Sequence, residues 1–347
     1  MGTILFTGFP GFLGSELLPR LLARAPGDRA VCLVQAKFLP LARERAAAID
    51  ASRIELVEGD ITAPLALPAH DVREIYHLAA VYDLAVKRDV AMRVNVEGTR
   101  NVLDFAARCR SLERLHYVST CYVSGRYEGL YTEEDLEKGQ TFNNFYEETK
   151  YLAEVEVRKR MAAGLPATIY RPSVVVGDSR TGATQKFDGP YFVMQWLMRN
   201  PRIAVLPVVG RPAKYRFNVV PRDFIVDALE RLSGMRESLG KTYQLADPNP
   251  MTVAETIDAV ASATGRRVLR IPLTLSLAKG ALDYVPGVYR LMRIPSAAVN
   301  YFVHPTTYDT KNTTRDLGNV PPSFRDYLPR LVEFVRAHPE IGSAAMA

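Results

Sequence analysis

The chain has 347 residues, of which 48% are hydrophobic and 24% charged, and its formal net charge at pH 7 is +6. This composition is typical of a globular protein with one large domain or two modest ones. The positive charge is not gathered into Lys/Arg runs, so we expect no nucleic-acid partner. A mild positive field suits an anionic cofactor, a phosphate-bearing carrier or an acidic membrane surface, or it is a plain surface excess.

The cysteines and the N-terminal residues indicate the compartment. Cys32, Cys109 and Cys121 are widely spaced in apolar runs, which predicts buried thiols in a reducing environment. No Cys/His cluster has the spacing of metal ligands, so we expect no metal site. The first strand-like run begins at residue 3, which leaves no room for a signal peptide, and no apolar run has the length of a membrane span. We therefore expect a cytoplasmic protein.

Short β-branched apolar runs alternate with longer helical patterns through the first half of the chain. The predicted strands are 3–7, 30–35, 54–58, 74–80, 115–120 and 167–172. The predicted helices are 13–25, 95–109 and 145–163. Pro19 lies inside the first helical pattern and is expected to kink or divide it. The alternation implies βαβ units, and hence an α/β protein whose parallel sheet is covered by helices on both faces.

This rhythm breaks after residue 173. Gly, Pro and aromatic residues crowd the next stretch, and the later elements are a strand at 241–247, a helix at 252–265 and a strand-like run at 266–273. The tail at 275–303 is apolar but interrupted by prolines. We predict one sheet domain and a smaller, mostly helical C-terminal portion that closes over it.

The segment TGFPGFLG directly follows the first strand and opens the first helix. Its glycines, Gly8, Gly11 and Gly14, have the spacing G-x-x-G-x-x-G. Glycines let the backbone approach a pyrophosphate closely, and a helix N-terminus offers free N–H groups and a positive dipole end to that anion. In this strand–turn–helix context the segment predicts a dinucleotide site. The alternative is a plain tight turn.

The end of the second strand indicates which dinucleotide binds. An acidic residue at this point binds the ribose 2′-hydroxyl and repels a 2′-phosphate. Here the strand ends in Gln35, with Lys37, Arg43 and Arg45 soon after. The pattern favours NADP(H) without excluding NAD(H). Alternatively, all three basic side chains are solvent-exposed residues of a helix with no role in cofactor binding.

The ends of the next two strands carry further candidates. Asp60 follows the third strand, where its carboxylate could accept a hydrogen bond from an adenine amine or cap a turn. The small residues of HLAA (77–80) end the fourth strand. They would let the backbone lie against a cofactor, or they serve packing alone.

Tyr146 and Lys150 stand four apart in NNFYEETKYLAE (143–154), at the start of a predicted helix. Positions i and i+4 share one helix face, so both heads can reach the same point. A phenol has a pKa of about 10 in water, and a nearby ammonium lowers it. The pair could form a tuned general acid or base, but the spacing alone arises often by chance and the rest of the chain has to decide. The alternative is an ordinary helix with a half-buried Tyr and a Lys that extends to water.

Taken together and in order, the motifs of residues 1–230 resemble those of an extended short-chain dehydrogenase/reductase (SDR). They are TGFPGFLG, GDI, HLAA, NVEGTRNVL, YVSTCYVSG, YEETK and RPSVVVGDSRTG. Two of them, with FNVVPRDFIVDAL (217–229), are most similar to the branch of fatty acyl-CoA reductases and thioester reductases. Phe9 and Pro10 depart from that branch, which has Ala-Thr there.

The resemblance implies a fold and a domain organisation. The fold would be a Rossmann-type doubly wound parallel sheet. An NAD(P)-binding domain would span 1–172, with 217–247 returning to it. The substrate-binding portion would be formed by 173–216 and 248–347.

The resemblance also implies roles for individual residues. Tyr146 would give a proton to a carbonyl oxygen as hydride reaches the carbon. Lys150 would hold the nicotinamide ribose and keep the Tyr146 pKa low. Thr120 would donate a hydrogen bond to the reacting oxygen, with Ser119 as the alternate. Asn95 would mark a helix kink whose neighbouring carbonyl helps to place a water near the lysine, unless it is a surface residue.

The implied cofactor contacts come from the loops described above and from two residues after the sixth strand. They are Gly8, Phe9, Gly11, Phe12, Leu13, Gly14, Gln35, Lys37, Asp60, Ile61, Leu78, Ala79, Ala80, Asn95, Ser119, Tyr146, Lys150, Pro172 and Ser173.

We expect NADPH-dependent reduction of a hydrophobic carbonyl substrate, either a fatty acyl thioester carried on CoA or acyl carrier protein or a fatty aldehyde. The rival function is a dehydrogenase or epimerase acting on a sterol-like or sugar-nucleotide substrate. For the pyrophosphate of a nucleotide sugar, Arg211, Lys214, Arg216 and Arg222 could provide the charge. A non-enzymatic, cofactor-binding regulator is disfavoured because the Thr, Tyr and Lys are all present.

Two apolar segments are candidates for substrate contact. Residues 186–198 contain the only Trp of the chain. The run at 275–303 could wall an acyl tunnel, touch a membrane peripherally or simply be core. A homodimer is left open.

Overall fold

The computed structural model of the chain describes residues 2–286, 292 and 295–342. Part of the apolar run at 275–303, namely 287–291 and 293–294, lies outside the described residues. Within the ranges that the structure describes, no helix combines the length and the apolarity needed to cross a membrane.

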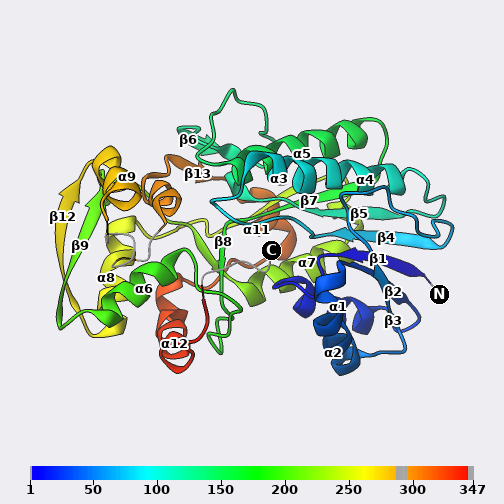
Figure 1. Ribbon diagram of the computed structural model, residues 1–347. Helices are drawn as coiled ribbons and strands as arrows, with labels where there is room; N and C mark the ends of the chain where they lie inside the picture. Colours follow the sequence, from blue (N-terminus) through cyan, green and yellow to red (C-terminus); the bar gives the residue numbers. More distant parts are fainter. Residues whose placement is uncertain (1, 287–291, 293–294, 343–347) are drawn as a thin grey trace.

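A seven-stranded parallel sheet forms the centre of the fold (Figure 1). Its strands are β1 (Thr3–Thr7), β2 (Arg29–Val34), β3 (Ile54–Glu58), β4 (Val72–His77), β5 (Arg114–Val118), β7 (Ala167–Pro172) and β11 (Thr242–Leu245). Their spatial order is β11-β7-β5-β4-β1-β2-β3, and every neighbouring pair is parallel. The chain leaves β1 in one direction and returns on its other side at β4. This is the predicted Rossmann-type doubly wound sheet, and a crevice for ligands opens at the switch point between β1 and β4.

Helices cover both faces of this sheet (Figure 1). One face carries α1 (Gly14–Arg24), α2 (Leu39–Ile49) and α7 (Arg222–Gly234), and the other carries α3 (Arg88–Ala91), α4 (Gly98–Ala106) and α5 (Phe145–Ala162). Alternation along β1 explains the two layers, because successive strand residues point to opposite faces. Ile4 and Phe6 pack in the α1/α7 core, whereas Leu5 packs in the α4/α5 core.

The smaller portion of the fold is built from two-stranded sheets and helices. Its strands are β6 (Gly129–Tyr131), β8 (Val174–Val176), β9 (Ile203–Val209), β10 (Val219–Pro221), β12 (Arg267–Leu273) and β13 (Thr306–Tyr308). Its helices are α6 (Pro190–Arg199), α8 (Val253–Thr264), α9 (Leu275–Tyr284) and α12 (Phe324–Ala337), whereas α11 (Lys311–Leu317) packs against β11 and α7 of the sheet layer. A separate hydrophobic core joins α6, α8 and α12 to β9. The predicted domain boundaries remain a prediction.

Most predicted strands match the observed ones closely, and the differences have physical reasons. The strand expected at 74–80 ends at His77, because residues 78–80 leave the sheet to line a cavity. The helix expected at 95–109 is a π-helical turn (Met92–Glu97) followed by α4. Pro19 does not divide α1, whose buried leucines hold it on the sheet despite the missing N–H donor. The three cysteines are buried free thiols, as predicted.

A buried ion pair fixes α5 against the sheet. Arg171 on β7 and Glu154 on α5 have fully buried side chains, with 2.6 Å between Arg171 Nη2 and Glu154 Oε1. The Ser119 hydroxyl donates to the second oxygen of the same carboxylate at 2.6 Å. Burial alone would raise the pKa of Glu154, but the Arg171 guanidinium, together with Arg158 and the Ser119 hydroxyl, outweighs burial and holds this pKa below its ordinary value. The helix and the end of β5 are therefore tied at one charged centre.

Removing the cation of this pair should destabilise the fold strongly, because it leaves a buried carboxylate without its main partner. We expect Arg171→Met to lower the free energy of unfolding by about 3–5 kcal/mol in denaturant titrations. The matched control is Arg73→Met, which breaks the exposed pair with Glu113 and should cost less than about 1 kcal/mol. Equal losses in the two variants would contradict this account of α5.

Candidate active site

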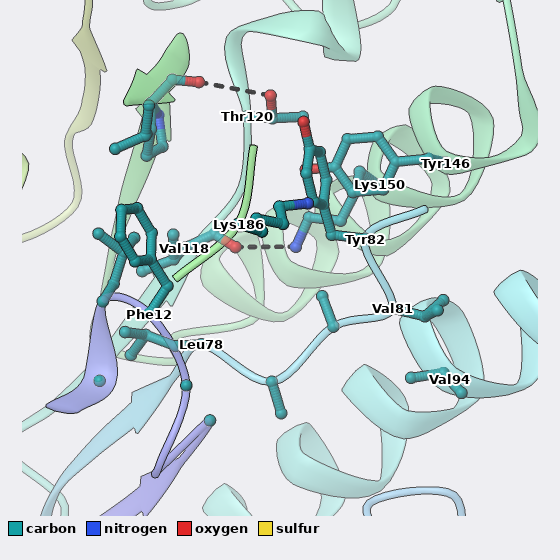
Figure 2. Close-up of a pocket in the computed structure, with 18 of the residues that line it drawn as sticks. Phe12, Leu78, Val81, Tyr82, Val94, Val118, Thr120, Tyr146, Lys150 and Lys186 are labelled. Atoms are coloured by element: carbon teal, nitrogen blue, oxygen red, sulfur yellow. Dashed lines mark hydrogen bonds between the residues drawn. The ribbon is translucent and has the colours of Figure 1, made fainter. Parts of the chain in front are cut away.

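A cavity of about 750 Å³ lies at the carboxyl ends of the sheet strands, where the two halves of the sheet diverge. It is walled by the glycine loop, by the ends of β2, β4 and β5, by the start of α5 and by segments of the smaller portion. All the catalytic and cofactor-contact residues implied by the family resemblance line this cavity except Asn95. Figure 2 shows the part of the cavity around Tyr146 and Lys150.

The three glycines of the loop lie too close to neighbouring backbone to carry a side chain. Gly8 has φ +95°, and a Cβ there would lie 2.9 Å from the backbone nitrogen of Ala79. A Cβ at Gly11 or Gly14 would lie 2.7 or 2.5 Å from the Gly8 carbonyl oxygen. Leu13, which precedes α1, offers no side-chain acceptor to the helix N-terminus. At the glycines the backbone can therefore approach a pyrophosphate closely, and the N-terminus of α1 adds a positive dipole end.

The end of β2 presents one of the three basic residues expected there to the cavity. Lys37 lines the cavity, with its ammonium 4.9 Å from the centre of the Phe38 ring. Arg43 is exposed on α2, and Arg45 donates to the Pro10 carbonyl and to the Ser15 hydroxyl, which braces the glycine loop. Only Lys37 of these three is thus placed to meet a cofactor directly.

Asp60 is held in place by neighbours on the same side of the cavity. Its carboxylate accepts from Gln35 Nε2 at 2.7 Å and from the Thr62 N–H at 2.9 Å. Burial acts to raise the Asp60 pKa, but these hydrogen bonds outweigh it and lower the pKa. A charged acceptor therefore faces this end of the cavity, next to Ile61.

Asn95 positions the wall of the cavity without lining it. It is buried in the π-helical turn, so the surface alternative is wrong. Its side-chain oxygen accepts from the Val81 N–H at 2.9 Å, and its amide donates to the Val81 carbonyl at 3.3 Å and to Thr149 Oγ1 at 3.0 Å. It thereby ties the segment after β4 to α5.

Tyr146 and Lys150 lie one turn apart on α5, whose start is fixed by Asn144. The Asn144 side chain accepts from the Glu147 N–H at 2.9 Å, which sets the helix start. Tyr146 is 8% exposed and Lys150 3% exposed. Lys150 Nζ donates to the Val118 carbonyl at 2.8 Å (Figure 2). Both side chains therefore sit in a desolvated pocket at the end of β5.

The Thr120 hydroxyl completes the group. It donates to the Pro172 carbonyl at 3.3 Å (Figure 2). A side-chain hydrogen bond with Thr120 also acts to lower the pKa of Tyr146. The Thr120 side chain caps the short turn Cys121–Ser124 by accepting from the Tyr122 N–H. Its neighbour Ser119 is committed to Glu154. Of the two hydroxyls considered from the sequence, Thr120 is the one that meets the phenol.

The pKa of Tyr146 differs from the expectation that Lys150 keeps it low. Burial raises the pKa of Tyr146, the hydrogen bond with Thr120 acts against it, and Glu147 and Asp188 raise it further. Burial lowers the pKa of Lys150 to about 7, which Glu154 opposes. Lys150 is directed to the Val118 carbonyl, and desolvation dominates both groups. Lys150 is therefore not among the groups that lower the pKa of Tyr146 in this pocket.

Ser173 supplies an independent sign that a polar ligand belongs in the cavity. Its hydroxyl is buried, lines the cavity and has no hydrogen-bond partner among the described residues. Buried polar groups without a partner are costly, so such a group indicates a ligand atom that completes it. An amide such as a nicotinamide carboxamide would do so. With the glycine loop and Asp60, the residues present fit a nicotinamide dinucleotide.

Several cavity residues were not singled out from the sequence. Tyr82 packs its ring edge-on against Tyr146, with centroids 4.9 Å apart. Lys186 and Asp188 also line the cavity, and they fall in the 186–198 segment expected to contact substrate. The Trp of that segment, Trp196, instead packs in the core and donates to the Val205 carbonyl at 3.1 Å. From the run at 275–303, Ala298, Tyr301 and Phe302 reach the cavity.

Comparisons with known proteins identify relatives of the chain. The chain is 30% identical to the non-canonical nonribosomal peptide synthetase cpsA of Aspergillus campestris, over 70% of this chain and 25% of cpsA. It is also 30% identical to a linear gramicidin synthase of Brevibacillus parabrevis, over 74% of this chain and 5% of the synthase. The aldehyde reductase lnbA of Aspergillus flavus is 25% identical over 78% of this chain and 29% of lnbA. The chain thus spans less than a third of these longer relatives.

A solved structure resembles the chain over almost its whole length. The terminal R domain from the myxalamid PKS-NRPS biosynthetic pathway matches with a TM-score of 0.82 and 27% identity, covering 99% of this chain and 92% of that domain. Residues 6–229 match the family described as Male sterility protein, an NAD-binding family. The chain therefore belongs to this family, within the thioester-reductase-like branch of the extended SDRs, a superfamily of NAD(P)-dependent oxidoreductases.

Proposed function

We propose that this chain is an NADPH-dependent reductase of a hydrophobic acyl thioester, carried on CoA or a carrier protein, or of the corresponding aldehyde. The observation that carries the proposal is a single cavity in which the Thr120 and Tyr146 hydroxyls meet beside an apolar wall. That wall is formed by Leu84, Val174, Phe217, Ala298 and Phe302. Relatives named as peptide synthetases and aldehyde reductases support a carbonyl substrate.

The residues of the cavity divide the chemistry between them. A bound nicotinamide supplies hydride to the carbonyl carbon. Tyr146 donates its phenolic proton to the carbonyl oxygen as negative charge develops there, and Thr120 donates a hydrogen bond to the same oxygen. Burial raises the pKa of Tyr146 and so disfavours free phenolate. The phenol therefore stays protonated until negative charge develops on the carbonyl oxygen of the substrate. Apolar side chains around both hydroxyls exclude water.

Lys150, Ser173 and the glycine loop orient the cofactor in this proposal. The Lys150 ammonium lies at the end of β5, where it can bind ribose hydroxyls while it remains anchored on the Val118 carbonyl. The unpartnered Ser173 hydroxyl would pair with the carboxamide. Lys37 would meet a 2′-phosphate, and this supports NADP(H) over NAD(H).

The sugar-nucleotide alternative lacks a basic pocket in the right place. Arg211 and Lys214 are exposed and outside the cavity, and Arg216 lines a separate cavity of about 210 Å³. Arg222 stacks on Phe12 and pairs with Glu16 at 3.5 Å. Four cations that do not converge offer no pyrophosphate site, so the apolar acyl substrate is the better fit. A homodimer, a peripheral membrane contact and a cytoplasmic location stay predictions.

The proposed function is tested by NADPH consumption with a long-chain acyl-CoA. We expect turnover by the wild-type chain and a loss of about 10²-fold or more in Tyr146→Phe, because the proton donor is removed. The matched control is Tyr151→Phe, further along α5 and outside the cavity, which should retain activity. Full turnover by Tyr146→Phe would contradict the assignment.

Cofactor preference should depend on Lys37. We expect Lys37→Met to lower kcat/KM for NADPH about 10-fold, or about 1.4 kcal/mol, because a phosphate partner is lost, and to leave the value for NADH nearly unchanged. Arg43→Met, which removes an exposed cation on α2, should leave the NADPH/NADH ratio at the wild-type value. Equal effects of Lys37→Met on the two cofactors would argue against a 2′-phosphate contact.

The buried lysine should make stability depend on pH. Lys150 releases its proton near pH 7 in the folded chain but only near the ordinary lysine pKa of about 10.4 in the unfolded chain. Between these values the unfolded state binds more protons, so stability rises with pH by up to about 1 kcal/mol per pH unit. Denaturant titrations from pH 7 to 9 should show this rise relative to Lys150→Met. A constant difference between the two proteins would refute the lowered pKa.

A further inference from the structure

Lys186 forms a charged cluster next to the proton donor. Its ammonium lies 3.9 Å from the centre of the Tyr82 ring and 2.5 Å from a carboxylate oxygen of Asp188. Tyr82 in turn contacts Tyr146 edge-on. Figure 2 draws Lys186, Tyr82, Tyr146 and Lys150 in the same part of the cavity, on different segments of the chain. A second ammonium is thus one ring away from the reacting phenol.

Lys186 lies at one end of the cavity, which we call the substrate end. This end is lined by residues from the segments 82–84, 184–189, 217 and 298–302. Among these described residues Lys186 is the only cationic side chain. Lys37 and Arg93 line the cavity near Asp60, at the other end. Lys186 is also partly open to the cavity, with 23% of its side chain exposed.

Reduction of a thioester releases a thiolate leaving group, whereas reduction of an aldehyde releases none. The carbon–sulfur bond must break, and the sulfur leaves with the bonding electron pair. A thiol has a pKa of about 8.5, and a bare thiolate in an apolar cavity is poorly solvated. Tyr146 serves the oxygen and Lys150 is anchored on Val118. The sulfur therefore needs a donor of its own.

We propose that Lys186 is a further catalytic residue, the acid that protonates the departing thiolate; this rests on the proposed function. After hydride and the Tyr146 proton have converted the thioester carbonyl to a hemithioacetal, its hydroxyl returns the proton to Tyr146. The carbon–oxygen double bond forms, the carbon–sulfur bond breaks, and the sulfur takes a proton from the Lys186 ammonium. Aldehyde and free thiol leave, and water reprotonates Lys186. One hydride and one proton are consumed in all.

Asp188 and Tyr82 act as positioning residues for this step. The Asp188 carboxylate forms an ion pair with the Lys186 ammonium, and the Tyr82 ring face stabilises the cation by a cation–π contact. Tyr82 also hydrogen-bonds to Asp188, which closes the cluster. The ammonium is thereby held against the Tyr82 ring, which in turn packs on Tyr146.

The test compares two substrates with the same acyl chain, decanoyl-CoA and decanal, in the presence of NADPH. We expect Lys186→Met to lower kcat for decanoyl-CoA about 10²-fold and to leave decanal reduction close to wild type, because only the thioester has a leaving group. Tyr146→Phe should impair both substrates. Lys159→Met, an exposed lysine on α5, is the matched control and should impair neither. NADPH binding by each variant, followed by fluorescence, confirms that it is folded.

The leaving group provides a second readout. A thiophenyl decanoate releases a weaker base than CoA, so it needs less help from an acid, and the loss in Lys186→Met should shrink. A loss that is equal for decanal and both thioesters would overturn the proposal and leave Lys186 a structural residue. A wild-type chain that reduces decanal but not the thioesters would overturn it too. Inactivity of the wild type on all substrates would contradict the proposed function itself.

Discussion

The buried pair of Glu154 and Arg171 is the interaction on which the site depends. It joins α5 to β7, and through Ser119 it reaches the end of β5, next to Thr120. Tyr146 and Lys150 stand on the same helix, so the three catalytic candidates share one rigid support. A charge pair in this position is costly to desolvate, and its value lies in fixing geometry. The same desolvation extends along the helix and lowers the pKa of Lys150.

The topology of the sheet explains why a cavity exists at all. The order in which successive strands join the sheet reverses between β1 and β4, and the loops at that point diverge. Glycines let the backbone of the first loop approach a ligand closely, and Asn95 holds the segment after β4 by a hydrogen bond to Val81. The cofactor end thus consists mainly of backbone and a few fixed polar groups. The substrate end is apolar, with Lys186 and Asp188 as its charged pair.

The central sheet and the order of the motifs could be predicted from the sequence, because strand-forming β-branched runs and glycine turns depend only on residues that are close in the chain. The strands at 3–7, 54–58 and 167–172 are predicted to the residue. Features that depend on distant contacts were not accessible. The partnership of Tyr82 with Lys186 joins residues about a hundred positions apart, and the burial of Asn95 depends on Val81 and Thr149. Likewise, Arg45 turns to Pro10 only because the loop and α2 meet in space.

The central claim is that hydride reaches a thioester carbonyl held beside Tyr146 and Thr120. It is tested most directly by incubating the purified chain with decanoyl-CoA and NADPH that carries deuterium at the transferable position. We expect decanal, or decanol after a second reduction, with deuterium on the former carbonyl carbon, together with one free thiol per aldehyde formed. Product without deuterium at that carbon, or no product from a chain shown to bind NADPH, would contradict the claim.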